Sequence, residues 1–417
     1  MTARELPLSV SQRDVWLDQR AWPGSTHLNI GGGAFIEGPL DLTIFRRALV
    51  ELIRTTDALR LAPHDDGTQR LLTPDEVTPR LEEIDIEPGE GAKDTMRSIW
   101  NQRVTEPFAL DGTPPWRFVL LRADDRLHGL SIQFHHLVMD GWGTSVIMQR
   151  WGELYEHLRT GQINGEIPAL DYARFINDSL AYRASPAFAR DSAYWLERMP
   201  DLPPPLLERR YAAANDHSLA PSRLAKITIP RNAYDLLVHW ATRQGSSAFN
   251  VFLTALILYF ARTTRQRDIV VGVPALNRSG HRYQDTAGMF VGVLPIRVHV
   301  DPQASIAQLA SQIGQAVASA LRHQRYPLSE LSKALDAIRQ HRDSLFDLLL
   351  SFERQDFDVR FGEARLVDTM APRHAHEEPR ALPPEPQHAE HHEHREHPRK
   401  PARPLERQPR ELWDEVL

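Results

Sequence analysis

Alternating strand and helix signals are the sequence feature that most restricts the fold of this chain. Residues 41–60 place apolar side chains at helical spacing behind Asp41, which can cap the start of a helix. Residues 128–134 alternate in the manner of a strand, with Leu130, Ile132 and Phe134 facing inward. A polar turn follows, and residues 146–158 return to helical spacing. The first half therefore predicts a mixed α/β fold with a turn at a strand end, where functional sites are often built.

The second half of the chain repeats this pattern after a proline-rich stretch over residues 200–221. Its signals follow in this order: a short strand at 225–229, a buried helix at 248–261, strands at 268–273 and 291–300, an amphipathic helix at 305–323, and a strand at 345–352. Two mixed α/β (α+β) lobes are the simplest architecture that satisfies both halves. We assign residues 1–175 to the first lobe, 176–222 to a connecting helix and linker, and 223–370 to the second lobe.

The composition excludes several classes of protein. A net charge of -6 and a pI near 6.3 argue against a dedicated nucleic-acid binder. Without cysteine, the chain has no disulfide, no thiolate nucleophile and no cysteine zinc site. Residues 1–7 lack the features of a signal peptide, and the longest apolar run, 251–261, is about half of what a membrane span needs. We expect a soluble cytoplasmic protein with no membrane or nucleic-acid partner.

The sharpest chemical motif is His135-His136-Leu137-Val138-Met139-Asp140-Gly141, at the turn between the strand and the helix. Imidazole titrates near neutrality, so a histidine here can accept a proton from an attacking nucleophile or hold the nucleophile in line. An aspartate four residues after His136 is better placed to fix the turn than to act on a substrate. Gly141 permits a close approach that a side chain would block.

Two alternatives to a catalytic role stay open from the residues alone. The histidines and the aspartate could bind a metal, or they could be ordinary residues at a strand end. Adjacent residues of a strand point to opposite faces, so His135 and His136 are poor joint ligands. We therefore expect no metal site.

Together with other segments, this motif resembles the condensation domains of nonribosomal peptide synthetases, whose signature is HHxxxDG. The further matches occur in the family's order along about 350 residues: Leu8 to Trp16, Asp57 to Arg60, Pro107 to Leu110 with Pro115 to Arg117, Tyr172-Ala173 with Tyr194-Trp195, Asp268 to Gly272 with Asn277-Arg278, Gly288 to Pro295, and His323 to Pro327.

The resemblance implies two chloramphenicol-acetyltransferase-like lobes, arranged as a V-shaped pseudo-dimer around a central tunnel. His136 would stand at the reaction centre, with His135, Asp140 and Gly141 as the other catalytic-motif residues. Asp140 would be structural and would pair with Arg60; the alternative for Arg60 is a solvated charge or a helix C-terminal cation. Trp142 and Met289 would contact substrate, although Trp142 could equally serve packing, and residues 289–295 would help to close the tunnel.

The resemblance also implies an activity and its partners. The enzyme would be an acyltransferase that forms an amide between a donor acyl thioester and an aminoacyl acceptor. No cofactor would be bound covalently, because phosphopantetheine comes on donor and acceptor carrier proteins, and adenylation domains would be neighbours. An aspartate-based motif would indicate heterocyclisation, and the string from Phe290 to Pro295 is unlike that of epimerisation domains. Residues 140–143 together with this string are similar to starter, or lipo-initiating, condensation domains.

The resemblance stops near Met370. Residues 371–410 are rich in His, Pro, Glu and Arg and poor in large apolar residues, so we expect a disordered tail over 371–417. The second lobe would then be incomplete and would lack the crossing back to the first lobe. A shifted reading frame is our hypothesis, and the coding DNA around residues 365–375 would test it. A genuine tail that binds metal through histidines is the alternative: His388, His391, His392, His394 and His397.

Two competing functions follow from these features. One is an acyltransferase of the same superfamily that uses a coenzyme A or carrier thioester and a hydroxyl acceptor. The other is an inactive, truncated condensation-like module that binds a carrier protein or nothing.

Overall fold

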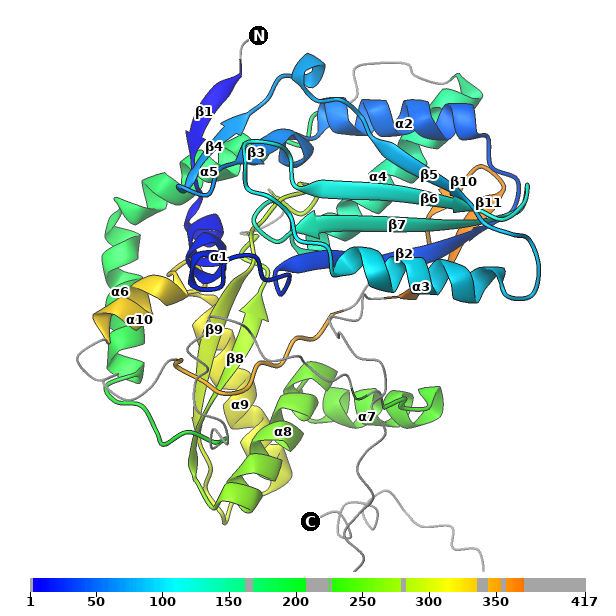
Figure 1. Ribbon diagram of the computed structural model, residues 1–417. Helices are drawn as coiled ribbons and strands as arrows, with labels where there is room; N and C mark the ends of the chain where they lie inside the picture. Colours follow the sequence, from blue (N-terminus) through cyan, green and yellow to red (C-terminus); the bar gives the residue numbers. More distant parts are fainter. Residues whose placement is uncertain are drawn as a thin grey trace, which may run out of the picture. The chain divides into compact units, whose positions relative to one another are not determined.

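The computed structural model of the protein describes residues 3–161, 168–207, 225, 227–278, 283–335, 344–353 and 358–370 (Figure 1). The helices are α1 (Val10–Ala21), α2 (Leu42–Thr55), α3 (Ala92–Val104), α4 (Gly141–Thr160), α5 (Tyr172–Arg183), α6 (Pro186–Arg198), α7 (Arg231–Arg243), α8 (Ala248–Thr264), α9 (Ile306–Leu321) and α10 (Leu328–Ala334), with the short 3₁₀ helices η1 (Asp57–Arg60) and η2 (Pro74–Glu76). The strands are β1 (Arg4–Pro7), β2 (Asn29–Glu37), β3 (Leu61–Pro63), β4 (Thr68–Leu71), β5 (Leu81–Asp85), β6 (Trp116–Arg122), β7 (Leu127–His135), β8 (Asp268–Ala275), β9 (Gly292–His299), β10 (Arg360–Phe361) and β11 (Ala364–Met370).

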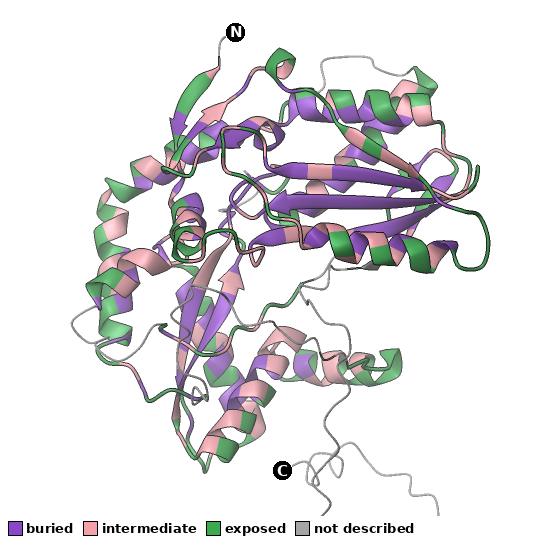
Figure 2. Ribbon diagram, in the orientation of Figure 1, coloured by how far each residue is buried: buried purple, intermediate pink, exposed green. Residues whose placement is uncertain are grey.

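A six-stranded sheet in the order β10-β11-β2-β7-β6-β5 organises the first half. The β5–β6 pair is parallel, and the other pairs are antiparallel. The predicted strand at 128–134 is confirmed as part of β7. Both faces of β7 are buried (Figure 2), because α3 covers the second face, and a Cβ on Gly129 would lie 3.0 Å from the Trp100 ring.

Helices α2 and α4 cover the opposite face of this sheet. Asp41 caps α2 as expected, because its Oδ1 accepts the backbone N–H groups of Thr43 and Ile44. On α4, the fully buried Trp151 stacks on Phe45 with 4.5 Å between ring centroids. The predicted helix 41–60 ends early, at Thr55. The next residue, Thr56, is extended and forms a bridge with Leu170, so η1 is a separate element.

The second half is built on the antiparallel pair β8–β9, against which α8 and α9 pack. The strands at 268–273 and 291–300 and the helices at 248–261 and 305–323 are confirmed. The burial predicted for the whole of 248–261 is wrong: Val251, Leu253 and Ile257 are buried, but Tyr259 is 61% exposed. Only one face of α8 has the β8–β9 sheet to cover it.

Two predicted strands of the second half do not form as expected. Residues 345–352 make only an isolated parallel bridge, between Leu349 and Gly272 of β8. The described residues of 225–229 have no regular structure, and Ile227 is 88% exposed. No described strand lies beside this segment, and an extended segment without a partner gains no ladder hydrogen bonds.

The hairpin of β10 and β11 belongs to the sheet of the first half. β11 pairs with β2, with Leu366 opposite Ile36, and the buried ring of Phe361 packs on Phe45 and Tyr155. Residues 360–370, which we assigned to the second lobe, therefore belong to the first sheet. A crossing from the second half back to the first, which we expected to be missing, is thus present before residue 371. The physical reason is the free edge of β2, which β11 covers. The tail 371–417, with its histidines, lies outside the described residues.

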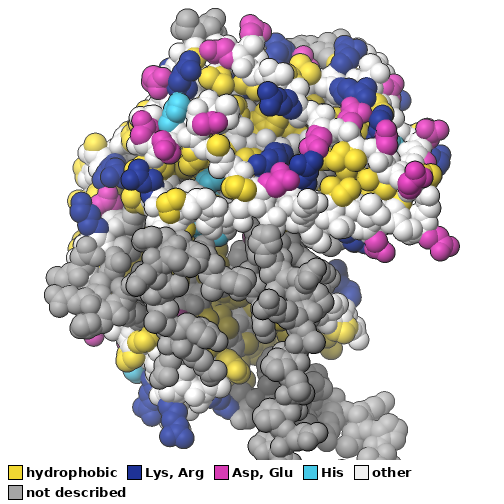
Figure 3. All heavy atoms as spheres, in the orientation of Figure 1, with side chains coloured by type: hydrophobic (Ala, Val, Ile, Leu, Met, Phe, Trp, Pro, Cys, Tyr) yellow, Lys and Arg dark blue, Asp and Glu magenta, His cyan; other side chains and the backbone are white. Residues whose placement is uncertain are grey.

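Two further properties concern the charge of the surface and the apolar length of the helices. On the face shown in Figure 3, side chains of both charge signs are interspersed over the upper part of the described surface, whereas Lys and Arg side chains gather at its lower end. Among the described helices, none is by itself long and apolar enough to cross a membrane. The pair α7 and α8 meets the length and composition criteria together, but it is bent by 97° at its junction. The V-shaped arrangement and the tunnel stay predictions.

Candidate active site

The HHxxxDG motif occupies the turn between β7, which ends at His135, and α4, which begins at Gly141. Asp140 is the N-cap of α4, and its Oδ1 accepts the backbone N–H of Gly143 at 2.7 Å. The predicted order of strand, turn and helix is thus confirmed, and the turn lies at the carboxyl end of the central strand.

Asp140 joins the turn to the second half of the chain. Its fully buried carboxylate binds the Arg278 guanidinium in a bidentate ion pair at 2.9 and 3.0 Å. It also accepts the backbone N–H groups of Phe290 at 3.0 Å and Val291 at 3.3 Å. With every lone pair engaged, this carboxylate is a structural group rather than a proton acceptor for a substrate.

The predicted partner of Asp140 was wrong. Arg60 instead donates to Asp57 at 2.6 Å and to the Leu72 carbonyl at 2.8 Å, because η1 holds it beside a carboxylate three residues earlier. Arg60 therefore has a structural role, but it stabilises only the chain around η1 and does not reach Asp140. The true partner, Arg278, occurs in the Asn277-Arg278 string that carries the family resemblance, but its role was missed.

Two glycines outside the predicted site allow the halves to meet closely. A Cβ on Gly143 would lie 3.0 Å from the backbone nitrogen of Gly288. Gly288 has φ +154°, and its Cβ would lie 2.1 Å from the Tyr172 ring. Gly141 is different: the three atoms nearest to a Cβ there would all belong to the Glu353 carboxylate, with Oε2 at 3.6 Å, an ordinary van der Waals contact. Close packing therefore does not require glycine at 141.

His136 has one ring nitrogen buried within the turn. Its backbone N–H donates to the Leu28 carbonyl at 2.8 Å, which fixes the residue, and its buried Nδ1 has no hydrogen-bond partner among the described residues. Burial lowers the pKa of His136, while the nearby Asp140 and Glu353 carboxylates act in the opposite direction. The imidazole is therefore neutral near pH 7 and can accept a proton.

His135 has a different environment on the other face of the strand. Its Nδ1 accepts the Leu137 N–H at 3.0 Å, so Nε2 carries the proton and donates to Gln19 Oε1 at 2.9 Å. Burial lowers the pKa of His135 to about 3, and His136 and His27 add to this effect. Both ring nitrogens are engaged within the fold, which favours a supporting role. Among the described residues, no cluster of His, Asp and Glu is placed to hold a metal ion.

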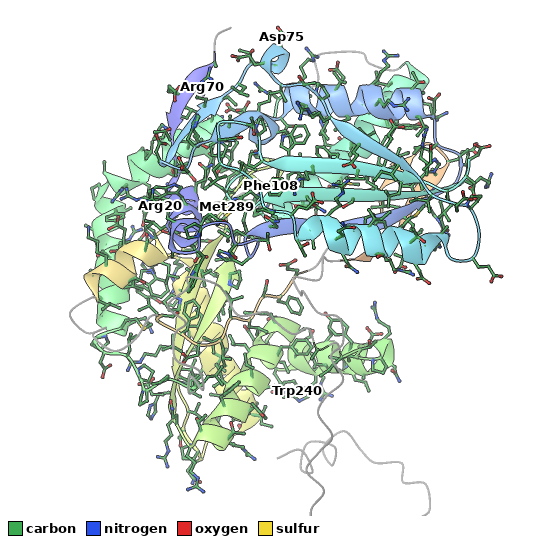
Figure 4. The ribbon with its side chains drawn as sticks, viewed as in Figure 1. Arg20, Arg70, Asp75, Phe108, Trp240 and Met289 are labelled. Atoms are coloured by element: carbon green, nitrogen blue, oxygen red, sulfur yellow. The ribbon has the colours of Figure 1, made fainter. Side chains whose placement is uncertain are left out.

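The two predicted substrate contacts differ in exposure. Trp142 is 39% exposed, and its indole N–H donates to the Gln284 carbonyl at 2.7 Å, so the ring lies at the surface beside the turn. The Met289 side chain (labelled in Figure 4) is buried in the hydrophobic core, and its carbonyl accepts the Tyr172 hydroxyl. Its contacts in this structure are therefore those of a packing residue. Within residues 289–295, β9 begins only at Gly292, because the backbone N–H groups of Phe290 and Val291 bind Asp140.

Known proteins match this chain over most of its length. The family model described as "Condensation domain" matches residues 2–378. One of the plipastatin synthase proteins of Bacillus subtilis is 27% identical over 358 residues, which cover 84% of this chain and 13% of that protein. Phosphinothricin tripeptide synthetase PhsC of Streptomyces viridochromogenes is 29% identical over 380 residues, which cover 89% of this chain and 34% of that protein. The chain thus spans about a third or less of the length of these relatives.

Solved structures give the same result. The first condensation domain of the calcium-dependent antibiotic synthetase, in complex with a substrate analogue, matches with a TM-score of 0.74 and 26% identity, and covers 88% of this chain and 84% of that chain. A variant of the starter condensation domain of rhizomide synthetase, in complex with C8-CoA, matches with a TM-score of 0.77 and 25% identity, and covers 89% and 83%. The expected mixed α/β fold is confirmed.

Proposed function

Because the chain belongs to the condensation-domain family, we propose that it forms an amide bond between a carrier-bound donor acyl thioester and the amine of a carrier-bound aminoacyl acceptor. The observation that carries this proposal is the neutral imidazole of His136, whose pKa is lowered by burial and whose backbone is fixed by Leu28 in the turn between β7 and α4. The phosphopantetheine arms of donor and acceptor carrier proteins would supply both substrates, and adenylation domains would load the amino acids.

In this mechanism His136 holds the amine and takes up its proton as nitrogen attacks the thioester carbon. A neutral imidazole suits this step, because a protonated ring would repel the ammonium form of the acceptor and could not accept a hydrogen bond. Asp140 and Arg278 hold the turn so that His136 stays in place while substrates bind. His135 supports the turn from its other face.

A fatty acyl donor is the finer part of the proposal. Its support is the likeness to a starter condensation domain that was solved in complex with C8-CoA. Donors of several chain lengths therefore belong in the test.

The experiment is intact-protein mass spectrometry of an aminoacyl-loaded acceptor carrier, mixed with acyl-loaded donor carrier and this protein. We expect the acceptor to gain the mass of the acyl group, and His136→Ala to lower the rate by about 10²–10⁴-fold while its thermal unfolding stays close to that of the wild type. A wild type without turnover on any donor would favour the inactive module. Transfer only to a hydroxyl acceptor would favour the O-acyltransferase.

A further inference from the structure

A second carboxylate lies in front of Gly141, the last residue of the HHxxxDG motif. It belongs to Glu353, whose Oε2 and Oε1 would lie 3.6 and 3.9 Å from a Cβ on Gly141. The segment before it is fixed to β8, because Gly272 donates to the Leu348 carbonyl at 2.8 Å and accepts the Leu350 N–H at 2.9 Å. The Ser351 hydroxyl donates to Glu353 Oε1 at 3.2 Å, which orients the carboxylate.

The two carboxylates near His136 differ in what they can do. Asp140 is fully buried and is committed to Arg278 and to backbone N–H groups. Glu353 is exposed, so solvent and a substrate can reach it. Its charge also acts on His136, whose pKa it raises. Of this pair, Glu353 is therefore the group that can exchange its contacts for those of an incoming cation.

An aminoacyl acceptor brings such a cation. Its α-amino group is largely an ammonium ion near pH 7, because α-amino pKa values lie near 8. A neutral imidazole offers this ion a hydrogen bond but no charge, whereas a carboxylate offers both. Binding of the ammonium ion therefore favours a carboxylate, whereas its later deprotonation favours a neutral base. Both groups are needed at the same place.

Building on the proposed function, we propose that Glu353 binds the ammonium group of the acceptor in front of Gly141 and aims its nitrogen past His136 at the thioester carbon. The ammonium loses one proton to solvent before attack. The neutral amine then forms the C–N bond as the C–S bond breaks, and its second proton passes by way of His136 to the thiolate that leaves. One thioester and one ammonium thus give one amide, one thiol and one proton. Glu353 is a positioning residue for the acceptor and leaves the donor side unchanged.

The test compares an ammonium acceptor with a neutral one. Initial rates are measured by mass spectrometry at varied concentrations of two acceptor carriers, one loaded with an amino acid and one with aminooxyacetate, whose nitrogen is uncharged at pH 7. For Glu353→Gln we expect the KM of the aminoacyl carrier to rise about tenfold, which is the scale of one lost charge-assisted hydrogen bond. The KM of the aminooxy carrier and that of the donor carrier should stay at the wild-type values.

Matched variants separate a local role from a general effect of charge. Glu353→Asp keeps the carboxylate and should recover part of the aminoacyl KM. Asp358→Asn removes one negative charge from an exposed residue five positions later and should change neither KM. If Glu353→Gln is active and its KM rises equally for both acceptors, or for neither, the role of Glu353 is overturned while the proposed function stands. A wild type that is silent with both acceptors would overturn the proposed function, and this inference with it.

Discussion

At the scale of single residues, the buried pair of Asp140 and Arg278 is the interaction whose loss should cost most. Arg278→Gln leaves a fully buried carboxylate without its guanidinium, and breaking such a pair typically costs about 3–5 kcal/mol. Chemical denaturation measures this as a fall in the free energy of unfolding. Arg54→Gln is the matched control, because Arg54 and Glu51 form an exposed pair, whose loss should cost about 0.5 kcal/mol. Equal effects of the two variants would contradict the structural role of Asp140.

The same pair shows what sequence can predict about a residue. The motif located the turn and the opposed histidines correctly, because these depend on residues close in the chain. The partner of Asp140 depends on how distant segments pack, since Arg278 lies 138 residues away. Glu353 was missed for the same reason, because the position of its segment depends on a bridge to Gly272 of β8, which is distant in the sequence.

At the scale of elements, the contact of the 288–291 segment with α5 depends on the absence of a side chain at residue 288. Gly288→Ala should lower the free energy of unfolding by about 2–4 kcal/mol, because the new Cβ would displace the Tyr172 ring and its hydrogen bond to the Met289 carbonyl. Gly89→Ala is the matched control: φ is similar, at +142°, but no atom lies within 4 Å of the new Cβ. It carries the backbone cost alone, about 1 kcal/mol. Thermal or chemical unfolding of both variants measures the two decreases in the free energy of unfolding. Equal decreases would show that close packing at residue 288 is unimportant.

The elements also show where periodicity suffices. It predicted β7, α8 and α9, whose own side chains contain enough apolar surface to specify an amphipathic or buried element. It failed at 225–229 and at 345–352, because a strand is defined by hydrogen bonds to a neighbour that the local sequence does not contain. The β10–β11 hairpin was missed for the same reason, since the free edge of β2 decides where it pairs.

At the scale of the whole described molecule, polar contacts between distant segments hold the two halves together, and one of them should make stability depend on pH. The Asp14 carboxylate of α1 accepts the Ser329 hydroxyl of α10, and burial raises the pKa of Asp14 to about 6, with a smaller contribution from Glu330. In the unfolded chain this pKa is about 3.9, so between pH 4 and 6 the folded state binds more protons. The contribution of Asp14 to stability is therefore fully present below pH 4 and is lost as pH rises to 6.

We expect the wild-type protein to lose about 2 kcal/mol of unfolding free energy over this range relative to Asp14→Asn, which cannot ionise. Chemical denaturation of both proteins at several pH values measures the difference. Parallel curves for the two proteins would mean that the α1–α10 contact does not titrate, whereas converging curves toward low pH would confirm a protonated carboxyl at this junction.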